Sequence, residues 1–298
     1  MMDVYLNGRM IAYDKAMVPH DDASIQHAVG LFETMTAEHG SIFRLRAHLK
    51  RLVDSASELG MTSSLDIESL HHAIKTTVTH NRIERARIRL TVTPGCVSLL
   101  RGDAGQPPKP TILVVATDPI DYEPAYFESG ITVIVGPALA NPFDPLAGHK
   151  TMNYWSRLRT LRQAASVPCG EAIILNISNH LASGTVSNIF LVKAGHLLTP
   201  IARGEEAPGG LTAPVLPGVT RAAVLELGLD HDLTIEKRML DIEDLLNADE
   251  VFLTNSSWHI LPVTRIEKHP IGNGRVGLVT SQLRASLENL MVSENTRQ

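Results

Sequence analysis

The most informative stretch of this sequence surrounds one lysine and reads Gly148-His149-Lys150-Thr151-Met152-Asn153-Tyr154. Lys150 follows a predicted turn at Gly148, and the stretch leads into a predicted helix, 154–165. A lysine in such a place is most often a solvated surface residue. A catalytic role for Lys150 can therefore be inferred only together with other segments of the chain.

Three further segments stand out. The first, His48-Leu49-Lys50-Arg51-Leu52, lies on an amphipathic helix predicted over 44–59; the second is Leu181-Ala182-Ser183-Gly184-Thr185-Val186-Ser187-Asn188-Ile189-Phe190. The third, Leu216-Pro217-Gly218-Val219-Thr220-Arg221, is a turn that opens a helix. The free N–H groups and positive dipole end of such a helix suit a phosphate, although most helix N-termini bind only water.

The order and spacing of these four segments resemble the class IV, or fold type IV, family of pyridoxal-phosphate enzymes. That family includes branched-chain aminotransferases, D-amino-acid aminotransferases and aminodeoxychorismate lyases. The resemblance covers nearly the whole chain, from Tyr5-Leu6-Asn7-Gly8 to Ala248-Asp249-Glu250-Val251-Phe252 and Pro262-Val263. It implies a two-domain fold with pyridoxal 5'-phosphate at the domain interface, and a homodimer.

The resemblance also assigns roles to individual residues. Lys150 matches the lysine that forms the Schiff base with the cofactor and then moves the α-proton of the substrate. Arg51 matches an arginine that binds the cofactor phosphate, for which its planar fork is suited. Further cofactor contacts are implied for Val219, Thr220 and Ser256 at the phosphate and for Tyr154 at the phenolic oxygen.

One position departs from the family pattern. Most members have a glutamate that pairs with the pyridine nitrogen, and Ser183 occupies that place here. A carboxylate keeps the nitrogen protonated and makes the ring a strong electron sink, whereas a serine hydroxyl can donate to an unprotonated nitrogen. This favours elimination chemistry or an unusual transaminase, unless Glu33 or Glu171 substitutes for the missing carboxylate.

Two arginines and a serine are the predicted substrate-binding residues. Arg87 and Arg89 share one face of a predicted strand, where two guanidinium groups would suit a dicarboxylate or bulky acidic substrate. They fit a solvated edge strand near Glu84 equally well. Ser257, beside Ser256, is the third predicted substrate contact. The K-x-x-N spacing from Lys150 to Asn153 is shared by lyases and D-amino-acid aminotransferases, so it does not separate them.

Composition limits the remaining classes of protein. Of 298 residues, 44% are hydrophobic and 20% charged, which excludes a disordered chain, and the net charge of −5 disfavours a nucleic-acid binder. The two cysteines have no metal-ligand spacing, and no metal site is expected. With neither a signal peptide nor a membrane span in the pattern, we expect a cytoplasmic protein.

The chain is expected to be an α+β protein of two domains. Helices and strands of both kinds occur in residues 1–117 and again in 131–298, the part that contains the lysine. The stretch 118–130, with two prolines and four acidic residues, is the predicted linker.

Three functions follow from the resemblance. The leading one is transfer of an amino group between an amino acid, branched-chain or similar, and a 2-oxo acid. The alternative is an aminodeoxychorismate lyase that releases pyruvate and 4-aminobenzoate. The third is a non-catalytic scaffold that keeps the fold, against which Lys150, Arg51 and the Val219-Thr220 turn argue.

Overall fold

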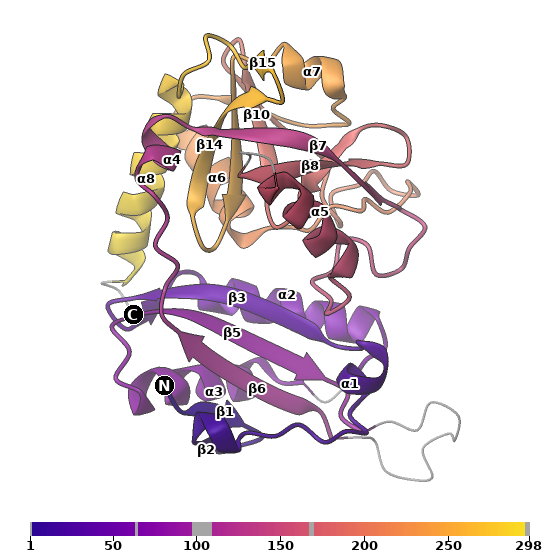
Figure 1. Ribbon diagram of the computed structural model, residues 1–298, viewed down its shortest axis with the longest axis vertical. Coiled ribbons are helices and arrows are strands. Elements are labelled where there is room, and N and C mark those ends of the chain that lie inside the picture. Colours follow the sequence, from indigo (N-terminus) through magenta and orange to yellow (C-terminus); the bar gives the residue numbers. More distant parts are fainter. Residues whose placement is uncertain (1, 63–64, 97–108, 167–169, 296–298) are drawn as a thin grey trace. The chain divides into compact units, whose positions relative to one another are not determined.

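A computed structural model describes residues 2–62, 65–96, 109–166 and 170–295 (Figure 1). Contacts divide the chain into two compact units. Unit 1 comprises Met1–Ile120, the short segment His149–Asn153 and Glu294–Gln298; unit 2 comprises Asp121–Gly148 and Tyr154–Ser293. Each unit combines helices with a sheet, and the predicted α+β class is confirmed.

Unit 1 is built on a six-stranded antiparallel sheet with the order β2-β1-β6-β5-β3-β4. Helices α2 (Leu45–Glu58) and α3 (Ile67–His80) pack on one face of it through a core of aliphatic side chains (Figure 1). Leu49 and Ile74 of these helices and Ile88 and Leu90 of the sheet are fully buried. The strands are β1 (Val4–Leu6), β2 (Arg9–Ile11), β3 (Leu31–Glu38), β4 (Ser41–Ile42), β5 (Arg85–Thr93) and β6 (Thr111–Thr117), and the short helices are η1 (Tyr13–Lys15) and α1 (Ala23–His27).

Unit 2 contains a nine-stranded mixed sheet with the order β12-β11-β10-β13-β14-β7-β8-β9, and β15 pairs with β14. Strand β7 is parallel to both β8 and β14, and the remaining pairs are antiparallel except β11 with β12. The strands are β7 (Ile131–Ala140), β8 (Glu171–Asn176), β9 (Leu181–Gly184), β10 (Asn188–Lys193), β11 (His196–Thr199), β12 (Thr234–Lys237), β13 (Glu250–Asn255), β14 (His259–Ile266) and β15 (His269–Pro270). The helices are α4 (Ala125–Glu128), α5 (Trp155–Ala165), α6 (Val219–Asp230), α7 (Ile242–Leu246) and α8 (Leu278–Asn295).

Two features of the chain differ from the pattern read in the sequence. A glycine directly after the apolar run 219–227 predicts a helix end at Gly228, but α6 continues through it to Asp230. The predicted linker contains the short helix α4. The stretch 94–110 is rich in glycine and proline and predicts a surface loop between β5 and β6, and it falls largely outside the described residues.

Lys150 was expected within the second part of the chain, yet its contacts group it with unit 1. The reason is that its segment pairs with β3, as described below. Within the described residues, none of the helices combines the length and the apolar character needed to cross a membrane.

Candidate active site

Lys150 lies on a short segment that pairs with β3 inside unit 1. The Phe32 N–H donates to the Lys150 carbonyl at 3.0 Å, and the Met152 N–H donates to the Gly30 carbonyl at 2.9 Å. The Lys150 Nζ atom lies 4.6 Å from the centre of the Phe32 ring, within the range of a cation–π contact. The backbone of Lys150 is thereby fixed against the sheet, while its amine lies over an aromatic side chain.

Gly30 makes this close pairing possible. A Cβ atom at this position would lie 2.6 Å from Met152 Sδ and 3.0 Å from the Val92 carbonyl oxygen. Such distances are shorter than van der Waals contact, so a side chain here would displace the Met152 thioether and crowd the Val92 carbonyl of β5. The glycine is therefore needed for the close approach, not for an unusual backbone angle.

A second attachment joins the lysine segment to α2. His149 Nδ1 and Ser55 Oγ are 2.9 Å apart. Ser55 lies four residues after Arg51, and residues with this spacing share one face of a helix. The helix that carries the predicted phosphate-binding arginine therefore also holds the residue next to Lys150.

Arg51 is oriented by a buried carboxylate that the sequence analysis considered only as a substitute for the missing glutamate. Glu33 Oε1 accepts from Arg51 Nε at 2.8 Å, and Oε2 accepts from Nη2 at 2.6 Å. The same Oε2 atom is 2.8 Å from His48 Nδ1. Two-point contact of this kind fixes the plane of the guanidinium group, so Glu33 determines where Arg51 points.

The charges of this triad follow from its burial. Burial raises the pKa of Glu33, but the charge of Arg51 and the contact with His48 outweigh it and lower that pKa to about 2. Burial lowers the pKa of His48, and the nearby charges of Arg51 and Lys150 add to the effect. His48 is therefore neutral at pH 7 and donates its Nδ1–H to an ionised Glu33.

The two substrate-side arginines lie on an inner strand. Strand β5 is hydrogen-bonded to β3 and β6, so the interpretation of Arg87 and Arg89 as an edge-strand face is wrong. The Arg89 guanidinium carbon lies 3.8 Å from the centre of the Phe32 ring, and its Nε donates to Thr91 Oγ1 at 3.3 Å. Phe32 thus contacts both Arg89 and Lys150, and these two cations share one aromatic side chain.

Arg87 lies two residues before Arg89 on the same face of β5. Its Nε atom is buried and has no hydrogen-bond partner among the described residues. A buried donor without a partner is costly, so this position is suited to an acceptor supplied from outside the chain.

In unit 2 the predicted phosphate contacts lie at the N-terminus of α6. Gly218 caps this helix with extended backbone angles and no side-chain hydrogen bond. Asn188 Nδ2 donates to the Leu216 carbonyl at 2.9 Å, and a Cβ atom on Gly218 would lie only 2.0 Å from Asn188 Oδ1. Strand β10 therefore holds the turn that presents the N–H groups of Val219 and Thr220.

The loop that carries Ser256 and Ser257 is joined to the same region. Asn188 is paired with Thr254 across β10 and β13. Asn255 Nδ2 donates to the Val186 carbonyl at 3.3 Å, and its Oδ1 accepts from the Ser257 N–H at 2.8 Å. Within unit 2, the structure thus gathers the loop after β13, the turn after β9 and the start of α6.

Ser183 lies at the end of β9 and is buried. Its hydroxyl oxygen accepts a hydrogen bond from Arg157 Nη1 at 3.2 Å. Tyr154 lies just before α5, with the Arg157 guanidinium carbon 5.9 Å from the centre of its ring. Arg157 thus contacts both residues that the resemblance places around the cofactor ring.

Three residues of these clusters had no role predicted from the sequence: His48, Phe32 and Arg157. His48 and Arg51 are three residues apart on one helix, and Glu33 shares the buried face of β3 with Met35 and Ala37. A carboxylate on the buried face of a strand needs a partner, so the triad had a detectable signal. Arg157 had none, because its contacts depend on how α5 packs on the sheet.

The model of the family described as "Amino-transferase class IV" matches residues 30–266 of this chain. The chain belongs to the class IV aminotransferases. Enzymes of this family depend on pyridoxal phosphate, and the residues present have chemistry that suits the cofactor: unit 1 contains a lysine amine and an oriented arginine, and unit 2 contains the start of α6, which has no side-chain cap.

Individual members of the class IV family are similar over their whole length. A protein of Methanocaldococcus jannaschii, provisionally named a branched-chain-amino-acid aminotransferase, is 32% identical over 97% of this chain and 96% of its own. The branched-chain amino acid aminotransferase of Escherichia coli is 26% identical, with a TM-score of 0.87 over 97% of this chain and 94% of its own. The 4-amino-4-deoxychorismate lyase of Pseudomonas aeruginosa is 25% identical, with a TM-score of 0.82 over 96% of this chain and 98% of its own.

Proposed function

We propose that this enzyme transfers an amino group between a branched-chain or similar amino acid and a 2-oxo acid, with pyridoxal phosphate held covalently by Lys150. The observation that carries the proposal is the fixed position of Lys150 against β3, with its amine near the Phe32 ring, on a segment attached to the helix of Arg51. The similarity to the Methanocaldococcus jannaschii protein supports the substrate class.

When bound, pyridoxal phosphate supplies an aldehyde that takes up amino groups and a ring that accepts electron density. Lys150 Nζ would remove the proton from the α-carbon of the substrate as a general base and deliver it again as a general acid. Arg51, the start of α6 at Val219 and Thr220, and Ser256 bind the phosphate. Tyr154 and Ser183 orient the ring, and Arg87, Arg89 and Ser257 bind the substrate.

A lyase that releases pyruvate and 4-aminobenzoate is the second candidate. Ser183 favours it, because a weaker electron sink suits a reaction that expels a leaving group before much charge accumulates. The similarity to the Pseudomonas aeruginosa lyase supports it as well. A lyase releases pyruvate without an amino acceptor, whereas a transaminase needs one.

The visible spectrum of the purified protein with added cofactor tests these candidates. L- and D-amino acids are added one at a time, and 4-amino-4-deoxychorismate is added separately. Bleaching by an amino acid, reversed by a 2-oxo acid, supports the transaminase and gives its stereochemical preference. Pyruvate release from 4-amino-4-deoxychorismate alone supports the lyase, and a protein that never takes up the cofactor would be a scaffold.

The Lys150→Ala variant should bind the cofactor without a covalent link. Its turnover should fall by about 1,000-fold or more, because both the covalent bond and the proton transfer depend on the lysine amine. Reduction with borohydride followed by mass measurement shows whether the link forms. Lys50→Ala, at an exposed lysine of α2 paired with Asp54, is the matched control. Full turnover in Lys150→Ala would refute the assignment.

We also propose that the enzyme is a cytoplasmic homodimer, as the family resemblance implies. The mass of the protein in solution tests whether it is a dimer.

A further inference from the structure

Arg157 makes a concentrated set of contacts at the end of β9. Its Nη1 atom donates to Ser183 Oγ at 3.2 Å, to the Gly184 carbonyl at 3.1 Å and to the Thr185 carbonyl at 3.1 Å. Arg157 lies in the first turn of α5, which packs on β7 and β8. A permanent positive charge is therefore held directly against the Ser183 hydroxyl.

The hydroxyl of Ser183 is oriented by this contact. Ser183 is 4% exposed, and Arg157 is its hydroxyl's hydrogen-bond partner among the described residues. Because the oxygen accepts from Arg157, the hydroxyl hydrogen remains available to donate. A buried hydroxyl whose hydrogen has no acceptor within the described protein is suited to an acceptor on a bound molecule.

Glu171 does not supply the missing negative charge. Its carboxylate accepts from the N–H groups of Ala172, Thr185 and Val186 and from the hydroxyls of Thr185 and Ser187. All of these groups belong to its own strand or to the turn after β9. The carboxylate therefore shapes that turn and is fully occupied in doing so.

Glu33 is occupied as well. Its two oxygens bind Arg51 and His48 within unit 1. Both carboxylates that could have replaced the usual glutamate thus have other partners, and the charge beside Ser183 is that of a guanidinium group.

We propose that Arg157 and Ser183 form a cationic hydrogen-bond donor site that holds the ring nitrogen of the cofactor in its unprotonated form. This inference rests on the proposed function, which places Ser183 beside that nitrogen. The hydroxyl donates to the lone pair of the nitrogen, and the guanidinium charge disfavours a second positive charge on the ring. Arg157 acts through Ser183 and is a positioning residue.

This arrangement changes what the enzyme can do with a substrate. A ring whose nitrogen stays neutral accepts less negative charge from the α-carbon. The enzyme is then suited to reactions in which Lys150 moves the proton in step with the departure of a group, or in which little carbanion character develops. The Arg157–Ser183 pair therefore bears on the choice between amino transfer and elimination at the site of Lys150.

Nitrogen NMR of the holoenzyme, reconstituted with pyridoxal phosphate labelled with ¹⁵N in the ring, tests the proposal. At pH 7 the unchanged enzyme should give the chemical shift of an unprotonated pyridine nitrogen. The double variant Arg157→Gln, Ser183→Glu should give the shift of a pyridinium ion, because it exchanges a cation for a carboxylate. A pyridinium shift in the unchanged enzyme would overturn the proposal.

Two further variants separate this role from a structural one. Ser183→Ala keeps the contacts of Arg157 to the two carbonyls and should raise the dissociation constant of the cofactor about 2- to 10-fold, the effect of one hydrogen bond, with the nitrogen still unprotonated. An unchanged constant would mean that the hydroxyl does not contact the ring. Arg159→Gln, at an exposed arginine of the same helix, should change neither the nitrogen chemical shift nor the dissociation constant of the cofactor. An effect as large as that of the double variant would mean that the overall charge of α5 causes the result, and it would overturn the proposal.

Failure of the proposed function has a different signature. If no variant takes up the labelled cofactor, including the unchanged enzyme, the proposed function is wrong and this inference falls with it. If the unchanged enzyme takes up the cofactor and transfers amino groups but its ring nitrogen is protonated, only the inference is wrong.

Discussion

At the scale of single residues, three arginines of the candidate site are each oriented by a specific partner. Arg51 is fixed by Glu33, Arg89 lies over Phe32, and Arg157 is held by the end of β9. Each guanidinium group is paired with a carboxylate, a ring or a carbonyl that fixes its plane. Fixed donors bind an anion without first losing conformational freedom, which is the physical basis of a preorganised site.

The Glu33→Gln variant tests the first of these pairs. The pKa of Glu33 lies at about 2 in the folded protein, below its ordinary 4.5. The pair therefore contributes stability that is fully present above pH 4.5 and is lost as the pH falls towards 2, by about 3 kcal/mol in all. The variant should be less stable than the unchanged enzyme by that order at pH 7, and the difference should shrink between pH 4.5 and 2.

Urea unfolding of both proteins at several pH values measures this difference. The control is Glu38→Gln, which removes the exposed pair with Arg85 on the same strand and should cost less than about 1 kcal/mol. A difference between Glu33→Gln and the unchanged enzyme that stays constant down to pH 2 would contradict the assignment of the pKa to this pair.

At the scale of elements, sequence periodicity predicted those parts that depend on local signals. The helix expected over 44–59 is observed as Leu45–Glu58. The apolar stretches 111–117, 188–193 and 196–199, each of which predicts a strand, are observed with the same ends as β6, β10 and β11. Strand β3, which pairs with the Lys150 segment, was not predicted. It mixes buried Glu33 with apolar neighbours, and its extended conformation depends on pairing with β4 and β5. Pairing between distant segments leaves no local pattern, so such elements need the whole fold.

Gly228 shows how tertiary packing overrides a local signal. A glycine in the interior of a helix costs about 1 kcal/mol relative to alanine, and it usually marks a helix end. In α6, however, a Cβ atom at position 228 would lie 2.8 Å from Leu197 Cδ2 and 2.9 Å from Ile235 Cδ1. The glycine allows α6 to approach β11 and β12, which explains why the helix passes through it.

The Gly228→Ala variant should therefore be less stable, although helix propensity alone predicts the opposite sign. We expect a loss of about 1–3 kcal/mol from overpacking, visible as a lower melting temperature. The control Ala222→Gly changes the same pair of residue types at an exposed position of α6 and should cost only about 1 kcal/mol. A higher melting temperature for Gly228→Ala would show that the close packing of α6 is not what selects the glycine.

At the scale of the whole molecule, resemblance and geometry contributed different information. The order of four segments indicated the family, which the family model confirms, and predicted Lys150 as its Schiff-base lysine. The partners of these residues, such as His48 for Glu33 and Arg157 for Ser183, come from segments far apart in the chain. No spacing rule joins such residues, and they became visible only with the fold.

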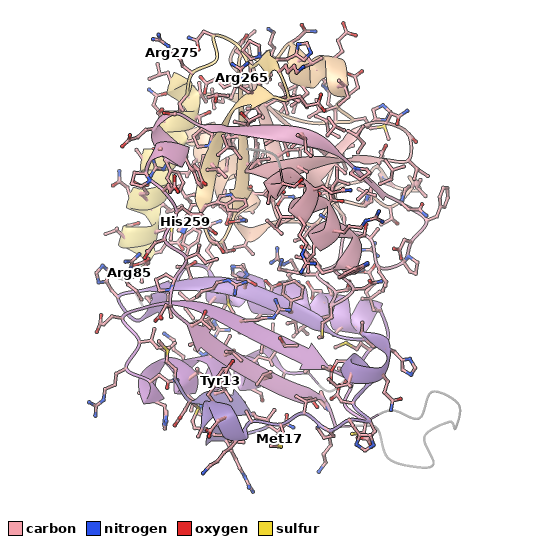
Figure 2. All side chains as sticks on the ribbon, in the orientation of Figure 1. Tyr13, Met17, Arg85, His259, Arg265 and Arg275 are labelled. Carbon is pink, nitrogen blue, oxygen red and sulfur yellow. The ribbon has the colours of Figure 1, made fainter. Side chains whose placement is uncertain are left out.

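A surface of unit 1 bears on the proposed homodimer. Four large apolar side chains between β2 and β3 are exposed: Tyr13 (50%), Met17 (77%), Ile25 (62%) and Val29 (37%). Figure 2 shows Tyr13 and Met17 at the surface of this unit. The segment is held in place, since buried Asp22 accepts hydrogen bonds from Thr93 Oγ1 at 2.9 Å and Thr111 Oγ1 at 2.7 Å. An ordered apolar surface of this kind is typical of an interface.

The double variant Met17→Glu, Ile25→Glu tests whether this surface holds the dimer together. The unchanged enzyme should have a mass in solution of about twice its 32.5 kDa. The variant should dissociate to the monomer without losing its fold, because a charge buried opposite its own copy costs several kcal/mol. Light scattering after size exclusion gives the mass, and circular dichroism shows whether the fold is kept.

Leu229→Glu, at a leucine of α6 that is 64% exposed, is the matched control and should remain dimeric. If the double variant stays dimeric, the second copy binds elsewhere, and if the unchanged enzyme is a monomer, the exposed apolar segment needs another partner.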